Sequence, residues 1–308
     1  MLALVNTPNG PAPVEIREVP EPQPARNEAL LAVHSFSLNR GELRSFVNNE
    51  EGWIPGQDIS GTIRQQAADG SGPPAGTRVV ALTDEFGWAQ RVAVPTHRIA
   101  ALPESVSFAA AASLPVAGLT ALRSLRHGGA LLGRRVLITG AAGGVGHLAV
   151  QLAAHSGAHV TAVAGRAERA DGLRELGASD VVLGIENAQG RFWLILESAG
   201  GASLSTALKL VEAKGTVVVY GNSSGEPSTI GFADFRGGQN GRLQSFFYFT
   251  SGPEEQFAPD LALLVSLVAA RSLTPQTGPE RSWRDIAQVA EELRGRRVSG
   301  KAVFHVEV

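Results

Sequence analysis

The 308-residue chain contains no cysteine, one methionine and two tyrosines. Without cysteine it can form no disulfide, no thiol nucleophile and no zinc or iron–sulfur site of the cysteine type. An excess of one charge is also lacking, because 27 Lys and Arg stand against 29 Asp and Glu. This balance argues against a nucleic-acid partner, which usually requires a basic surface. The composition is that of a globular protein long enough for two domains.

Long hydrophobic runs are missing as well. No uninterrupted apolar stretch reaches the roughly 20 residues that a membrane span requires. The first six residues, MLALVN, lack the basic and apolar regions of a signal peptide. We therefore expect a cytoplasmic enzyme or binding protein with no membrane partner.

The most informative segment is an apolar run (136–139), a turn of small residues (140–146) and an apolar-faced helix (147–154). Small residues let backbone N–H groups at a helix N-terminus approach a pyrophosphate, and the helix dipole favours its negative charge. The flanking strand and helix are the context that a dinucleotide fingerprint requires. The alternative interpretation of residues 140–146 is a tight turn that binds no ligand. The predicted cofactor-binding residues of this turn are Ala141, Ala142, Gly143, Gly144, Val145 and Gly146.

The second strand indicates which dinucleotide is bound. NAD sites usually place Asp or Glu at the end of this strand, where it binds the ribose diol. This chain has Ala164, Gly165 and Arg166 there. A guanidinium can pair in bidentate fashion with a 2′-phosphate, so we expect NADP(H) as the cofactor. The alternative is that Arg166 is a solvated residue in the first turn of a helix.

The pattern of apolar residues differs between the first hundred residues, which are rich in short β runs, and the residues that follow, where strands and helices alternate. Short β-rich runs (29–33, 78–82 and 89–94) and a loop at 66–76 occupy the first hundred residues. Strands then alternate with helices, which predicts a parallel sheet covered on both faces. The tail is expected to return to the first domain, so the predicted domains are 1–112, 113–253 and 254–308. The strands expected in the parallel sheet are 136–139, 159–163, 181–183, 192–196, 216–220 and 243–249, and the helices expected from residue 108 onward are 108–125 (interrupted near Pro115), 147–155, 168–176, 202–211, 261–271 and 286–294.

Five segments occur together in one order along the chain: SLNRGE (37–42), PGQDISG (55–61), the turn at 143–146, LGA (176–178) and GKAV (300–303). This combination resembles the medium-chain dehydrogenase/reductase superfamily, specifically its zinc-free quinone oxidoreductase branch, over essentially the whole chain. The resemblance implies an α/β protein with a GroES-like β-barrel catalytic domain and a Rossmann domain with a doubly wound parallel sheet. It also implies NADPH as the cofactor.

The zinc-dependent alcohol dehydrogenases of that superfamily differ at the positions that bind metal. They have Cys where this chain has Asn39, and Gly-His-Glu where it has Gly56, Gln57 and Asp58. None of the seven histidines has a metal-ligand spacing, so we expect no metal site. Without a Lewis acid, an already electrophilic acceptor such as a quinone or an enone is the expected substrate.

The resemblance also assigns site residues. Asn39 would donate to the substrate carbonyl, or alternatively form a turn before Gly41, and Arg40 would line the pocket or point outward in a salt bridge. Lys301 would reach a cofactor phosphate or remain a solvated surface lysine. The other predicted cofactor contacts are Thr120, Ser198, Gly221, Asn222, Phe246 and Phe247.

Several alternatives concern the activity. A short-chain dehydrogenase would need a tyrosine with a lysine four residues later, and neither Tyr220 nor Tyr248 has one. With no tyrosine assigned as proton donor, we expect solvent to supply the proton. An enoyl-thioester reductase of the same fold and a non-catalytic NADPH-binding sensor or structural protein both remain open.

The apolar run at 243–249 would be the last strand of the parallel sheet. An apolar edge strand promotes aggregation unless it is covered or paired with another strand. We therefore expect a homodimer that continues the sheet through this edge. The alternative is burial under the helices of the tail.

Overall fold

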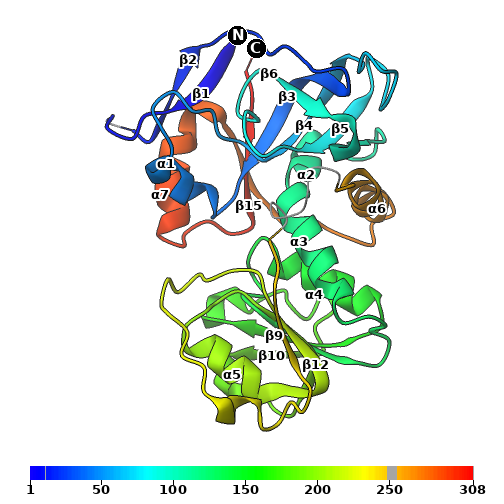
Figure 1. Cartoon of the computed structure of the whole chain (residues 1–308), viewed down its shortest axis with the longest axis vertical. Coiled ribbons are helices and arrows are strands. Elements are labelled where there is room, and N and C mark those ends of the chain that lie inside the picture. The colour runs from blue at the N-terminus through cyan, green and yellow to red at the C-terminus, as the bar shows by residue number, and fades with distance from the viewer. Residues whose placement is uncertain (11, 248–254, 308) are drawn as a thin grey trace. The chain divides into compact units, whose positions relative to one another are not determined.

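The computed structural model describes residues 1–10, 12–247 and 255–307. By its internal contacts the chain divides into two compact units (Figure 1). Unit 1 comprises Met1–Leu119 with Ser251–Val308, and unit 2 comprises Thr120–Thr250. The domain boundaries expected from the sequence, at 112/113 and 253/254, stay a prediction. None of the described helices has the length and apolarity needed to cross a membrane.

Unit 1 is built on a seven-stranded, largely antiparallel sheet in the order β14-β15-β3-β4-β5-β7, with β6 also paired to β3. A separate two-stranded ribbon joins β1 and β2. The strands are β1 Leu2–Asn6, β2 Val14–Glu18, β3 Glu28–Leu38, β4 Asp58–Gln65, β5 Arg78–Leu82, β6 Arg91–Pro95, β7 Ile99–Ala101, β14 Thr277–Ser282 and β15 Lys301–His305. Its helices are α1 Glu42–Asn48, η1 Thr96–Arg98, α2 Phe108–Ala112, α6 Ala258–Ala269, η6 Trp283–Asp285 and α7 Ile286–Arg294, and α3 Pro115–Arg126 begins here.

The two faces of the unit 1 sheet differ in chemistry. Phe36 of β3 pairs in register with Ile59 of β4 and Phe304 of β15, and all three belong to one buried apolar cluster. The rings of Phe36 and Phe304 stack at 5.2 Å between centroids. Side chains alternate along a strand, so the next pair in register, Ser37 and Asp58, faces the other side of the sheet. That face carries the polar site described below.

Unit 2 contains a six-stranded parallel sheet in the order β10-β9-β8-β11-β12-β13. Counted along the chain this is the doubly wound order 3-2-1-4-5-6, whose switch point lies between β8 and β11. The predicted α/β class is therefore confirmed. The elements are β8 Arg135–Thr139, α4 Gly146–His155, β9 His159–Ala164, η2 Ala167–Arg169, β10 Asp180–Leu183, η3 Ile185–Asn187, β11 Phe192–Glu197, α5 Ala202–Leu210, β12 Val211–Val219, η4 Phe232–Phe235 and β13 Arg242–Ser245.

Both faces of the parallel sheet are covered, as its apolar strands require. Leu137, Ile195 and Val217 pack in one cluster with α5. The alternate residues Val136 and Ile138 are also fully buried. Ligands bind at the carboxyl edge of such sheets, so a ligand is expected to contact the residues at the ends of β8, β9, β11 and β12.

Two predicted elements differ in the structure. The predicted helix at 168–176 is wrong: only the short η2 forms, followed by turns with i→i+3 hydrogen bonds such as Leu173 N to Ala170 O. Gly172 has a φ of +78°, which a right-handed helix cannot include. The predicted strand at 243–249 is shorter, because β13 ends at Ser245; residues 248 and 249 lie outside the described residues.

Candidate functional site

The turn between β8 and α4 presents backbone N–H groups. Gly143 N donates to Gly140 O at 2.8 Å, which closes the turn. For the N–H groups of Ala142, Gly144 and Val145 no acceptor is recorded within the described part of the chain, and all three residues are partly exposed. Orphan donors before a helix are suited to a bound anion. The turn therefore fits the pyrophosphate of a dinucleotide.

The helix after this turn begins close to the strand before it. A Cβ on Gly146 would lie 2.2 Å from Gly140 O and 2.7 Å from the Cα of Ala141. Any side chain at this position would push the helix away from β8. The structure thus requires glycine where the sequence analysis expects the close helix–strand contact.

A buried carboxylate ties the end of β8 to the loop after β11. Glu197 is fully buried and accepts hydrogen bonds from Ala199 N (3.0 Å), Gly200 N (2.9 Å) and Ser203 Oγ (2.8 Å). It also accepts one from Thr139 Oγ1 at 3.2 Å. The sequence analysis missed Glu197, although an acid at the carboxyl end of a parallel strand is a usable signal. Its bonds set the shape of the loop that carries Ser198.

Ser198 and Tyr220 contact the same strand end. Ser198 N donates to Thr139 Oγ1 at 2.8 Å, and Ser198 Oγ donates to Thr139 O at 3.2 Å. Tyr220 donates more weakly to Thr139 O, at 3.4 Å. Burial raises the pKa of Tyr220 to about 12, so the phenol keeps its proton at neutral pH. Tyr220, expected only as a packing residue, also bonds to the strand that precedes the turn.

The loops after β11 and β12 meet. A Cβ on Gly221 would lie 3.4 Å from the Cβ of Ser198, and one on Gly200 would lie 2.1 Å from Asn222 Oδ1. Asn222 also closes its own loop, because Oδ1 accepts from Ser224 Oγ at 2.9 Å and Gly225 N at 3.1 Å. The structure therefore brings the predicted residues Ser198, Gly221 and Asn222 together at the carboxyl edge of the sheet.

The residues that directly follow β9 are exposed to solvent. Ala164 is buried as the last residue of the strand, whereas Gly165 and Arg166 are exposed. A Cβ on Gly165 would meet nothing within 4 Å. Arg166 precedes η2 in an extended conformation, and the nearest acid along the chain is the exposed Glu168. The strand thus ends in an accessible guanidinium instead of a carboxylate.

The remaining predicted contacts of unit 2 are less clearly placed. Thr120 is 7% exposed within α3. Phe246 lies edge-on to the ring of His127, with 6.3 Å between centroids. Phe247 is 45% exposed. Nothing in these contacts singles them out as cofactor ligands.

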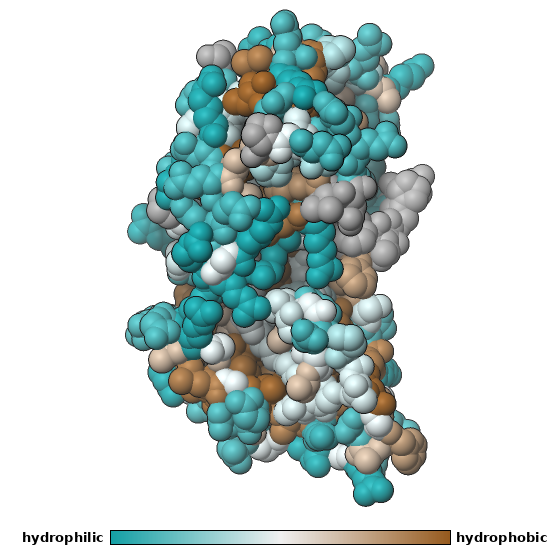
Figure 2. Space-filling model, turned by 90° about the vertical axis from the view of Figure 1, so that its left-hand side faces the viewer, coloured by the Kyte–Doolittle hydropathy of each residue, from teal (hydrophilic) through white to brown (hydrophobic). Residues whose placement is uncertain are grey.

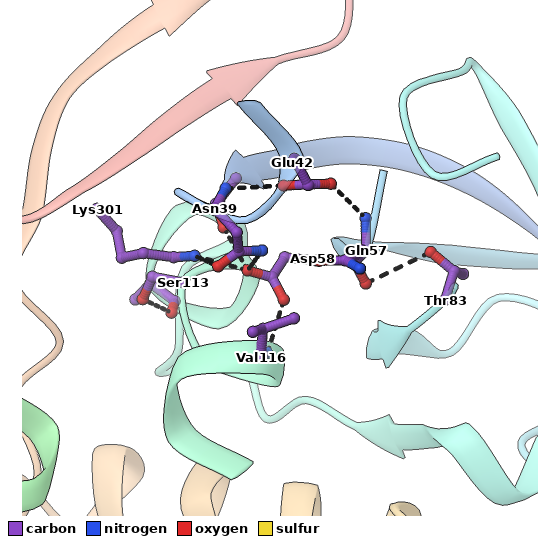
Figure 3. Close-up of polar contacts among 10 residues, drawn as sticks. Asn39, Glu42, Gln57, Asp58, Thr83, Ser113, Val116 and Lys301 are labelled. Atoms are coloured by element: carbon purple, nitrogen blue, oxygen red, sulfur yellow. Dashed lines mark hydrogen bonds and ion pairs between the residues drawn. The ribbon is translucent and has the colours of Figure 1, made fainter. Parts of the chain in front are cut away.

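Unit 1 contains a buried polar cluster, which we define as Asn39, Glu42, Asp58 and Lys301 (Figure 3). Asp58 is fully buried, and its Oδ2 accepts from Asn39 Nδ2 at 2.8 Å and from Lys301 Nζ at 2.7 Å. Ser37 Oγ donates to the same oxygen at 2.7 Å. Its Oδ1 accepts from Val116 N at 2.7 Å. Asp58 is therefore the centre of the cluster.

The structure contradicts one of the two alternatives given for Lys301, that of a solvated surface lysine. The side chain is 5% exposed and forms a buried ion pair with Asp58, so it is not a solvated surface lysine. Its ammonium also donates to Asn39 Oδ1. These contacts give no support to the assignment of Lys301 to a cofactor phosphate.

Glu42, at the start of α1, was missed by the sequence analysis. Its carboxyl oxygens accept from Asn39 N at 2.7 Å and from Gln57 N at 3.1 Å, which fixes the backbone on both sides of the cluster (Figure 3). Burial, reinforced by the nearby Asp58 charge, raises the pKa of Glu42 to about 8. The spacing Asn39-x-x-Glu42 is the capping-box pattern, which could have indicated this contact.

The two predicted catalytic residues differ in their surroundings. Asn39 follows β3 and is half-buried with its amide in the cluster, whereas Arg40 is exposed in the turn that follows. Within the described ranges, no group of three or more His, Asp or Glu is arranged to hold a metal ion. Asn39 is therefore the predicted catalytic residue that the structure places in an organised site.

Comparisons with known proteins agree with this architecture. A model of the zinc-binding dehydrogenase family matches residues 144–266. The chloroplast envelope quinone oxidoreductase homolog of Arabidopsis thaliana is 37% identical over 189 residues, which cover 56% of this chain and 57% of that protein. The matched segment thus spans little more than half of that relative. Human quinone oxidoreductase is 26% identical over 325 residues, covering 96% of this chain and 94% of the relative.

Solved structures share the fold over the full chain. An alcohol dehydrogenase superfamily protein from Novosphingobium aromaticivorans superposes with a TM-score of 0.90 at 26% identity and covers 100% of both chains. Escherichia coli quinone oxidoreductase, solved as a complex with NADPH, has a TM-score of 0.86 at 21% identity and covers 99% of this chain and 100% of its own. In sequence and in fold the chain is therefore similar to zinc-binding dehydrogenases and, among them, to quinone oxidoreductases.

Proposed function

We propose that the protein is an NADPH-dependent reductase that transfers hydride to a quinone or another α,β-unsaturated carbonyl. The observation that carries the proposal is the turn between β8 and α4, where the N–H groups of Ala142, Gly144 and Val145 have no recorded acceptor among the described residues. Relatives named as quinone oxidoreductases support the acceptor class. NADPH, when bound, supplies the hydride.

The preference for NADPH over NADH rests on Arg166. The end of β9 has no carboxylate that would repel a 2′-phosphate, and the exposed guanidinium of Arg166 offers two parallel donors to it. The NADPH complex of the Escherichia coli relative is consistent with this choice.

Asn39 is the residue that we assign to the acceptor. Its side-chain amide would donate a hydrogen bond to the carbonyl oxygen of the acceptor, which becomes an enolate or quinol oxygen as hydride is added. Donors that are already in place stabilise such charge without reorganisation. Solvent would then supply the proton.

Replacing Arg166 tests the cofactor assignment. In the wild type, NADPH should raise the melting temperature more than NADH at equal concentration, because the tighter ligand stabilises the fold more. Arg166→Asp should remove this preference and weaken NADPH binding by about tenfold or more, since a charge-assisted pair is replaced by repulsion. Arg236→Asp, which makes the same charge change at another exposed arginine of unit 2, is the control. Equal thermal shifts for the two cofactors in the wild type would contradict the assignment.

An enoyl thioester is the second candidate acceptor. A segment of the polyketide synthase protein NorB from Streptomyces orinoci is 34% identical over 251 residues, which cover 78% of this chain and 11% of that protein. Loss of NADPH absorbance with 1,4-benzoquinone, with an enone and with a 2-enoyl thioester would rank the three acceptors. Tight NADPH binding with no turnover of any of them would favour the non-catalytic alternative.

A further inference from the structure

We infer that Lys301 is a positioning residue that holds the Asn39 amide in one orientation and polarises it as an oxyanion donor. The inference rests on the proposed function, because it explains how the residue assigned to the acceptor oxygen is prepared for that task. It is carried by contacts within unit 1 and by the chemistry of the groups involved.

The orientation of the amide follows from its two partners. Lys301 Nζ can only donate, and it donates to Asn39 Oδ1. Asp58 can only accept when ionised, and it accepts from Asn39 Nδ2 at 2.8 Å. A flipped amide would direct its N–H groups at the ammonium and its oxygen at the carboxylate. The ion pair therefore selects one rotamer of the Asn39 amide.

One N–H of Asn39 is left over in this orientation. An asparagine amide has two N–H donors, and one of them is used by Asp58. For the second, no acceptor is recorded among the residues that the structure describes. Asn39 is also half-buried, while Asp58 and Lys301 are almost completely buried. The remaining N–H is therefore the part of this hydrogen-bonded trio that a small molecule can reach.

The ammonium also strengthens this donor. A cation bonded to the amide oxygen draws electron density from the amide and makes its N–H groups more positive, as expected for linked hydrogen bonds in a region of low dielectric constant. The 5% exposure of the Lys301 side chain limits screening of this charge by water. Asp58 compensates the charge of Lys301, so the polarised donor exists without an unpaired buried cation.

The test uses a variant in which both charges disappear together. Lys301→Met alone would leave Asp58 as an unpaired buried charge, which is strongly destabilising. Lys301→Met combined with Asp58→Asn keeps the approximate shape and leaves no charge behind. Melting temperatures establish that each variant is folded. The same double substitution is then made in an Asn39→Ala background, so that an effect transmitted through Asn39 can be separated from a direct one.

The measured quantity is the affinity for 4-nitrophenolate, a stable oxyanion, with the uncharged 4-nitroanisole as the matched ligand. We expect the wild type to bind the phenolate about tenfold more tightly than the double variant, and the anisole equally well. In the Asn39→Ala background the double substitution should change phenolate affinity by less than about twofold. No phenolate binding by the wild type, an unchanged affinity in the double variant, or a loss that persists with Ala at position 39 would each overturn the inference.

A measurement on the unmodified protein covers the case in which the variants do not fold. The two side-chain N–H protons of Asn39 should give separate NMR signals, with slow solvent exchange for the one bonded to Asp58 and fast exchange for the other. Equal exchange of both would overturn the inference. Turnover is assayed separately with NADPH and 1,4-benzoquinone. Phenolate binding with the expected pattern but no turnover of any acceptor would overturn the proposed function alone, whereas turnover without that pattern would overturn the inference alone.

Discussion

The buried carboxyl group of Glu42 makes the stability of unit 1 depend on pH. Its two recorded hydrogen bonds come from backbone N–H groups, of Asn39 and Gln57, and burial raises its pKa to about 8. The folded chain therefore holds this proton up to about pH 8, whereas the unfolded chain releases it near the ordinary glutamate pKa of 4.5. Between these values the folded state binds more protons, so this group makes the free energy of unfolding fall as pH rises.

Glu42→Gln removes this titration. The amide keeps one acceptor oxygen but directs its NH₂ group at the other backbone donor, which costs about 1–3 kcal/mol at any pH. The wild type is the more stable protein at pH 5.5. Its advantage should shrink by up to about 1.4 kcal/mol per pH unit on the way to pH 8.

Urea unfolding at both pH values measures the effect, and Glu18→Gln, at an exposed glutamate of β2, is the control. A difference between Glu42→Gln and the wild type that does not vary with pH would contradict the prediction.

At the level of elements, Glu197 is the residue that joins β8 and β11 at their carboxyl ends. Glu197→Ala would leave the N–H groups of Ala199 and Gly200 without their acceptor. Each unsatisfied buried donor costs about 1–3 kcal/mol, so we expect a loss of about 3 kcal/mol in stability. The thermal shift produced by NADPH should also shrink, because the loop that carries Ser198 loses its anchor. Glu186→Ala, at an exposed glutamate of η3, should leave both quantities unchanged.

Most elements of unit 2 were predictable because burial on both faces imposes a readable pattern. Apolar runs such as Leu194–Leu196 and the residues of α4 can be recognised without a structure. The segment at 168–176 has helix-forming residues around Gly172, but its backbone is left-handed at that glycine. The positive φ of Gly172 is incompatible with a continuous helix, and the periodicity of apolar residues carries no information about backbone φ values.

The candidate site was predictable only in part, for a reason of distance along the chain. The turn between β8 and α4 is local, so its residues could be identified from consecutive letters of the sequence. Lys301 and Asn39 are 262 residues apart, and their contact depends on the register between β15 and β3. The burial of Glu42 and Glu197 depends on neighbours contributed by other strands. No local pattern specifies those neighbours.

At the scale of the whole molecule, the expected homodimer concerns the edge of the parallel sheet. All four residues of the edge strand β13 are exposed, including Leu243 at 41%. The face shown in Figure 2 is largely hydrophilic, with apolar residues in separate patches. Among the described residues no further strand pairs with β13, and such an edge with an exposed leucine is a template for a second strand.

Light scattering tests the dimer. We expect the wild type to have twice the 32.2 kDa mass of one chain, and Leu243→Lys to have the mass of a single chain, because a charge at the edge opposes pairing. Leu183→Lys makes the same change on β10, the opposite edge of the same sheet, where the leucine is 45% exposed, and should leave the dimer intact. A wild type of single-chain mass would refute the dimer.

The pairing of β15 with β3 also has a consequence for biosynthesis. At about 5–20 residues per second, roughly 13–50 s pass between the synthesis of Asn39 and that of Lys301. During this interval the nascent chain holds Asp58 without its cation and β3 without its neighbour on one side. A ribosome that stalls between these two codons would leave a product that contains Asn39 but lacks Lys301, and its unpaired β3 edge would mark it for chaperones and proteases.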